Sequence, residues 1–180
     1  MKELRILSPT AILGYGFPED SFERGLDKEP DLIAADAGST DPGPYYLGAG
    51  ESFTDQTAVK RDLKLMIKAG QERDIPVIIG TAGGSGGTPH LQWCTDIVRE
   101  IAREEDLSFK LATIEAEQDK EFILDKFEAG AISALPPAEE ITREELEATT
   151  RVVGQMGVEP IIEALDQGAE VILAGRAYDP

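Results

Sequence analysis

The chain has 180 residues, of which 35 are acidic and 17 are Lys or Arg, so its formal net charge is −18 at pH 7. This balance leaves no basic stripe for nucleic-acid binding and disfavours attraction to an anionic membrane surface. The single cysteine excludes an internal disulfide and a cysteine-rich metal site, and the absence of a signal peptide or a long apolar stretch predicts a cytoplasmic protein.

Short apolar runs alternate with amphipathic segments along the chain. We expect strands at Leu4–Leu7, Leu32–Ala35, Val77–Ile79, Lys110–Ile114 and Val171–Ala174. Most of these runs are largely apolar, which is typical of parallel strands covered by helices. The alternation predicts a single α/β domain over residues 1–180, with a doubly wound parallel sheet of about five strands and helices on both faces.

Between these runs, apolar residues recur with a helical period. Helices are expected around Pro18–Leu26, along the stripes that begin at Val59 and Leu91, around Asp119–Phe127, and along the stripe Leu146, Thr149, Val153 and Met156. Thr142 and Glu145 have the spacing of a capping box at the start of the last of these helices. Glu159-Pro160 begins a further short helix through Leu165. Cys94 falls on an apolar stripe and is predicted to be a core residue.

Right-handed crossovers place every loop that follows a strand at the carboxyl edge of the sheet, where ligands of such folds bind. The loop after the second strand is longer than the usual ~2–6 residues of such connections. Asp36 at its start is predicted to act in proton transfer or to hold a cation, and Ser39 and Thr40 to bind an anionic ligand. Because Asp-Pro-Gly is a common turn sequence, Asp41 has either a cation-binding or a purely conformational role.

The loop after the third strand reads GTAGGSGGTPH, residues 80–90. Thr88 is a plausible N-cap and Pro89 suits the first helical position, so the glycines deliver the chain onto a helix N-terminus that attracts anions. The glycine spacing fits neither a Walker A loop nor a dinucleotide motif. The alternative is a tight turn that lets helix and strand pack closely. The predicted ligand-binding residues are Gly83, Gly84, Ser85, Gly86 and Gly87.

His90, the only histidine, would lie in the first helical turn, where the helix dipole disfavours the imidazolium. A neutral imidazole there would serve as general base, hydrogen-bond donor or metal ligand, and the alternative is a capping or solvent-exposed histidine. Arg176, after the fifth strand, would bind a ligand carboxylate or phosphate, or pair with an acidic residue of the edge. The candidate metal ligands are Asp36, Asp41 and Glu115, provided that they converge.

Three motifs resemble the N-terminal region of the acyclic terpene utilisation (AtuA-like) family: DAGSTDPGP at residues 36–44, GTAGGSGG at 80–87 and GRAYDP at 175–180. The resemblance extends along the whole chain. It implies catabolism of acyclic terpenoids or related carboxylic acids, as free acids or coenzyme A thioesters, but it implies no particular reaction. Family members continue beyond this point, so the resemblance also implies the N-terminal part, or a minimal version, of a longer protein.

Three functions therefore stay open. The first is an enzyme, or the ligand-binding half of one, of the lyase or hydratase type, with His90 or Asp36 in proton transfer; no nucleophile-elbow, dinucleotide or kinase motif is present. The second is a non-catalytic subunit that binds a metabolite and docks on a second copy or a partner chain. In that case residues 45–47 would lie on an apolar patch, whereas in an enzyme they would line or cover the pocket. The third is a metal-dependent hydrolase. Coenzyme A, as part of the substrate, and a divalent cation are the candidate cofactors.

Overall fold

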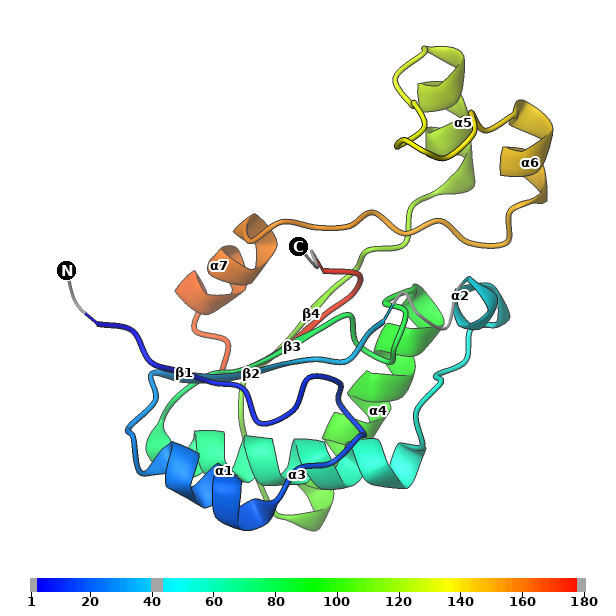
Figure 1. Cartoon of the computed structure of the whole chain (residues 1–180). Helices are drawn as coiled ribbons and strands as arrows, with labels where there is room; N and C mark the ends of the chain where they lie inside the picture. The colour runs from blue at the N-terminus through cyan, green and yellow to red at the C-terminus, as the bar shows by residue number, and fades with distance from the viewer. Residues whose placement is uncertain (1–2, 40–43, 178–180) are drawn as a thin grey trace.

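The computed structural model describes residues 3–39 and 44–177, whose centre is a single parallel sheet (Figure 1). Its five strands lie in the order β1-β2-β3-β5-β4. They are β1 (Ile6–Leu7), β2 (Leu32–Asp36), β3 (Val77–Gly80), β4 (Leu111–Ile114) and β5 (Val171–Ala174). The predicted α/β class and parallel sheet are confirmed, and β1 is the one strand that is much shorter than expected.

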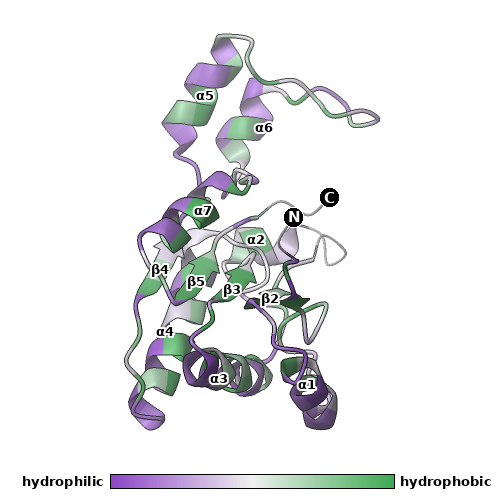
Figure 2. Cartoon of the chain, turned by 90° about the vertical axis from the view of Figure 1, so that its left-hand side faces the viewer, coloured by the Kyte–Doolittle hydropathy of each residue, from purple (hydrophilic) through white to green (hydrophobic). Residues whose placement is uncertain are grey.

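The described residues form seven helices, which the chain places unevenly about the sheet. The helices are α1 (Glu19–Leu26), α2 (Tyr45–Ala49), α3 (Gln56–Arg73), α4 (Thr88–Glu104), α5 (Lys120–Glu128), α6 (Arg143–Ala148) and α7 (Glu159–Asp166). Helices α1, α3 and α4 cover one face, α7 lies on the other, and α5 and α6 project away from the sheet (Figures 1 and 2). Within the described part of the chain, no helix is long and apolar enough to cross a membrane.

Alternate strand residues contribute to two cores. Ile33, Ile79 and Leu173 are fully buried in the larger core, beneath the face that carries α1, α3 and α4. Ile172 points the other way and packs with Ala164 of α7 in a smaller core. Burial of these side chains is what selects the register of the parallel strands, since a one-residue slip would exchange the two faces.

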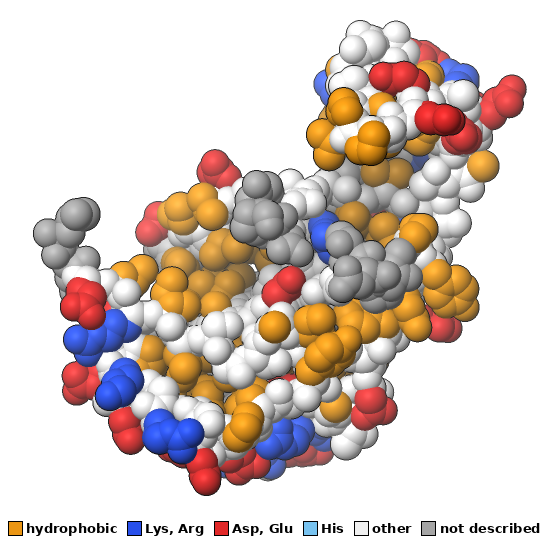
Figure 3. Space-filling view, in the orientation of Figure 1, with side chains coloured by type: hydrophobic (Ala, Val, Ile, Leu, Met, Phe, Trp, Pro, Cys, Tyr) orange, Lys and Arg blue, Asp and Glu red, His pale blue; other side chains and the backbone are white. Residues whose placement is uncertain are grey.

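The face that carries α7 is only partly covered. Leu7 packs against the larger core, so the neighbouring Ile6 points to the α7 side, where it is 59% exposed. Ile162 of α7 is also half exposed. Figure 3 shows apolar side chains at the surface on this side of the molecule. The expectation of helices on both faces therefore holds over β4 and β5, whereas the helices of the described residues cover only one face of β1 and β2.

The stripe from Leu146 to Met156 does not form one helix. The Thr142–Glu145 capping box is present, but α6 ends at Ala148. Residues 150–157, here called the strap, form no helix and make isolated β-bridges at Val153 and Met156. The strap amides of Gly154 and Met156 donate to the carbonyl oxygens of Ala116 and Arg176. The prediction of a continuous helix was wrong because these distant backbone partners outweigh the local helical period.

Candidate functional site

A cavity of about 370 Å³ lies at the carboxyl edge of the sheet. Its walls come from the loops after β2, β3 and β5 and from the strap, and they are formed by Ser39, Pro44, Leu47, Ser85, Val153, Gln155 and Arg176. The volume is within the range of small-molecule sites. Three residues that were predicted from separate loops, Ser39, Ser85 and Arg176, meet here.

The strap supplies the wall that sequence reasoning missed. It runs between the segments that follow β4 and β5: the Gln118 amide donates to Val152 at 2.8 Å, and the Met156 amide donates to Arg176 at 3.0 Å. This pairing carries Val153 and Gln155 to the cavity. The local sequence could not predict this pairing, because the hydrogen-bond partners are far apart in the chain.

The glycines after β3 serve close packing. Gly83 and Gly86 have φ values of +70° and +72°, which favour glycine. A Cβ atom on Gly83 would lie 2.3 Å from the His90 carbonyl oxygen, and one on Gly86 would lie 2.2 Å from the Arg176 nitrogen. These two positions fit the alternative role stated above, a tight turn that packs against the following helix and against the turn after β5.

Ligand binding by this loop would rest on a smaller set of groups. Ser85 is the one residue of residues 80–87 in the cavity wall. In residues 3–39 and 44–177, no acceptor is recorded for the backbone amides of Ser85, Gly86 and Gly87. These amides and the Ser85 hydroxyl are the groups through which the predicted anion binding would operate.

The N-terminus of α4 is already engaged by carboxylates of the chain. The helix begins at Thr88, with Gly87 rather than Thr88 as the N-cap. The Thr88 amide donates to Glu117 Oε2 at 2.8 Å, and its hydroxyl donates to Glu115 Oε2 at 3.0 Å. Free amides and the positive end of the helix dipole favour such a carboxylate. Glu117 therefore occupies part of the anion-binding position at the helix N-terminus that we expected a ligand to occupy.

His90 lies behind the glycine loop and is 1% exposed. Its Nε2 atom lies 3.0 Å from the carbonyl oxygen of Tyr46 and 3.1 Å from that of Glu51. Carbonyl oxygens only accept, so Nε2 carries the proton and donates, which holds the chain on both sides of the α2 C-terminus. Within the described residues, Nδ1 has no hydrogen-bond partner. His90 does not line the cavity, and its catalytic role stays a prediction.

Asp36 ends β2, where its Oδ1 accepts from the Gly38 amide at 3.0 Å. Asp36 is half-buried. It precedes the cavity-lining Ser39 by three residues but does not line the cavity itself. Thr40 and Asp41 lie outside the described residues. Among those that are described, no group of three or more His, Cys, Asp or Glu side chains could hold a metal ion. The metal set of Asp36, Asp41 and Glu115 therefore stays a prediction.

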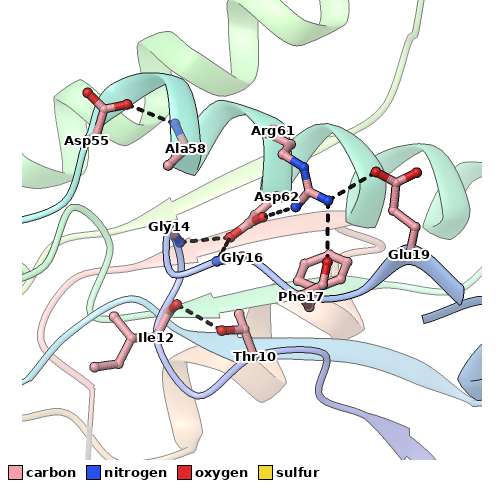
Figure 4. Close-up of polar contacts among 10 residues, drawn as sticks. All are labelled: Thr10, Ile12, Gly14, Gly16, Phe17, Glu19, Asp55, Ala58, Arg61 and Asp62. Carbon is pink, nitrogen blue, oxygen red and sulfur yellow. Dashed lines mark hydrogen bonds and ion pairs between the residues drawn. The ribbon is translucent and has the colours of Figure 1, made fainter. Parts of the chain in front are cut away.

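Asp62 is a buried carboxylate with a structural role that the sequence analysis did not identify (Figure 4). Its Oδ2 accepts from the amides of Gly14 and Gly16 at 2.9 and 3.0 Å, and its Oδ1 accepts from Arg61 at 2.9 Å. These contacts hold the loop after β1 against α3. The available signal was an aspartate on the apolar stripe, one residue before Leu63.

Residues 50–180 match the family model described as acyclic terpene utilisation family protein AtuA. The matched part contains the loop after β3, the strap and Arg176, whereas the motif at residues 36–44 precedes it, so the match is shorter than the resemblance that we expected. No curated protein and no solved structure shows a significant match to the chain. Because the family model covers well over half of the chain, the protein belongs to the acyclic terpene utilisation AtuA family.

Proposed function

We propose that the protein binds a small acyclic carboxylate in the cavity at the carboxyl edge, as part of the catabolism of acyclic terpenoids or related acids. The observation that carries the proposal is that one guanidinium and several apolar side chains line the same cavity. Arg176 lines the cavity together with Pro44, Leu47 and Val153. A guanidinium binds a carboxylate in a bidentate manner, and the apolar side chains suit a hydrocarbon tail.

Arg176 is available for such a ligand. In the part of the chain that the structure describes, its guanidinium makes no hydrogen bond or ion pair, and the residue is half-buried. The net charge of −18 repels anions at long range, but salt screens that repulsion beyond about 10 Å. A guanidinium inside the cavity then determines whether an anion is held.

The reaction that we propose is of the lyase or hydratase type, with the acid bound free or as a coenzyme A thioester. Asp36 is our candidate for proton transfer because it is half-buried at the end of β2, three residues before the cavity-lining Ser39. His90 is the weaker candidate, since it is buried and its Nε2 proton is shared between two carbonyl oxygens.

One observation favours the second function, a docking subunit. Tyr45 is 68% exposed on the same short helix that carries Leu47 into the cavity wall. The metabolite-binding part of that function needs the same cavity, so a binding experiment tests both hypotheses and a turnover experiment separates them.

The test compares a branched acyclic acid with the alcohol of the same carbon skeleton, by calorimetry and by thermal shift. At a ligand concentration of ~100 Kd, binding should stabilise the native state by ~2.7 kcal/mol. Arg176→Gln should weaken binding of the acid by about tenfold to a hundredfold, since a hydrogen bond to a charged group contributes ~1.5–3 kcal/mol. The alcohol should bind weakly to both proteins.

Arg99→Gln is the matched control, because Arg99 is an exposed arginine of α4 outside the cavity wall. It should leave the affinity for the acid unchanged. Equal binding of acid and alcohol, or an unchanged affinity in Arg176→Gln, would contradict the proposal.

A further inference from the structure

Glu117 joins two walls of the cavity without lining it. Its Oε2 accepts from the Thr88 amide at 2.8 Å, directly after the loop that carries Ser85. Its Oε1 lies 3.5 Å from Arg151 Nε in the strap, and its backbone pairs with Val153. One carboxylate thus contacts both the start of α4 and the strap.

Arg151 extends this connection to a third wall. Its Nη1 donates to the carbonyl oxygen of Gly48 in α2 at 2.7 Å, one residue after the cavity-lining Leu47. The side chains of Glu117 and Arg151 are only 24% and 25% exposed, so solvent screens their attraction less than it would at an open surface. In the described ranges, Arg151 Nε has no hydrogen-bond partner, and Glu117 is the carboxylate beside it.

His90 approaches the same place from the interior. A Cβ atom on Gly87 would lie 3.2 Å from Glu117 Oε2, from His90 Nδ1 and from Leu47 Cδ1. The unpartnered nitrogen of the buried histidine and the Oε2 atom of Glu117, which also accepts from the Thr88 amide, therefore lie around the same glycine, beside an apolar residue of the cavity wall. His90 secures α2 from inside through Nε2, while Arg151 secures it from outside.

We propose that Glu117 is a positioning residue for the ligand site, which fixes Ser85, Leu47 and Val153 relative to one another through Thr88 and Arg151. This inference rests on the proposed function, because it assigns these three residues to ligand contact. Glu117 touches no ligand itself. Its removal releases three segments at once, which a residue with a purely local role would not do.

The experiment measures hydrogen exchange and ligand affinity in Glu117→Gln, Glu117→Ala and Arg151→Gln. In Glu117→Ala, exchange should increase together in residues 44–51, 84–91 and 150–157, and acid affinity should fall by about tenfold or more. Glu117→Gln keeps an oxygen for the Thr88 amide, so it should restore protection at 84–91 but not in the strap. Both Glu117→Gln and Arg151→Gln break the same Glu117–Arg151 ion pair. The double variant should therefore lose less affinity for the acid than the sum of the losses in the two single variants.

Glu121→Gln, an exposed carboxylate on α5, is the control and should change neither measurement. If Glu117→Ala does not fold, Glu117→Gln and the double variant that combines it with Arg151→Gln still decide the question. Unchanged exchange in the three segments, or strictly additive affinity losses, would overturn the proposal. If the wild-type chain binds no acid but Glu117→Ala still loosens the three segments together, the proposed function fails while the structural coupling stands.

Discussion

The loops after β1 and β3 both contain glycines with left-handed backbone angles, yet different contacts hold them in place. In the first loop, the amides of Gly14 and Gly16 point at the buried carboxylate of Asp62. In the second, Gly86 brings its backbone against the backbone of Arg176, at a distance that excludes a Cβ atom. A buried carboxylate accepts from the glycine amides of the first loop, whereas Gly86 of the second lies directly against neighbouring backbone. Both glycine pairs thus have contacts within the protein, so glycine content alone does not mark a ligand-binding loop.

The largest effect should come from the packed loop. Gly86→Ala combines an unfavourable φ with overlap against Arg176, and we expect it to lower the free energy of unfolding by about 3–5 kcal/mol. Urea denaturation measures this loss. Gly168→Ala is the control, because Gly168 has φ +79° but no atom within 4 Å of an added Cβ. It should cost only ~1–2 kcal/mol. Equal losses would show that close packing is not what requires glycine in this loop.

A smaller effect is expected in the loop held by Asp62. Asp62→Ala leaves the amides of Gly14 and Gly16 without their acceptor and removes one of the acceptors of Arg61, which should cost about 2–4 kcal/mol. Asp62→Asn keeps one oxygen for the amides and should cost less. Neither the loop nor Asp62 lines the cavity, so acid affinity in Asp62→Asn should equal that of the wild type at temperatures where both are folded. A fall in affinity would mean that the two loops are coupled.

The smallest effect is kinetic and concerns the thiol beneath the second loop. Burial raises the pKa of Cys94 to about 12, although a hydrogen bond with the Gly83 backbone opposes the rise. At pH 8 almost no thiolate exists in the folded protein, so a disulfide reagent should label Cys94 only when the structure opens. If Cys94 is labelled as fast in the folded protein as in the urea-unfolded chain at the same pH, then the thiol is not buried in the folded protein.

Local signals account for what the sequence predicted well. The strands are apolar runs bounded by turns, and the Thr142–Glu145 capping box needs only two residues three positions apart. The strap was wrongly predicted as part of a helix because its apolar residues fit a helical period. Its backbone instead forms hydrogen bonds with the distant residues Ala116 and Arg176. Thr149, Val152 and Val153 are β-branched, which was the local hint of an extended chain.

The site was predictable where topology alone decides it. Ser39, Ser85 and Arg176 follow different strands, and a parallel sheet brings the ends of its strands together. Leu47 was expected to line the pocket only in an enzyme. Val153 and Gln155 were not predicted as site residues, because their places depend on the non-local pairs made by Glu117, Arg151 and the strap. Burial of His90 could not be predicted either, since the local sequence at a helix start is the same whether its histidine is buried or exposed.

The position of β5 has a consequence for biosynthesis. Among the described residues β5 is the last strand in chain order, yet it lies inside the sheet, between β3 and β4, which do not pair with each other. A ribosome that has made residues up to 170 has therefore released two strands with unpaired inner edges, and the guanidinium of the cavity has not yet been synthesised. Such edges recruit other chains. The nascent chain should need a chaperone until Val171–Ala174 emerges, and insertion of that segment joins β3 to β4 and brings Arg176 to the cavity in one step.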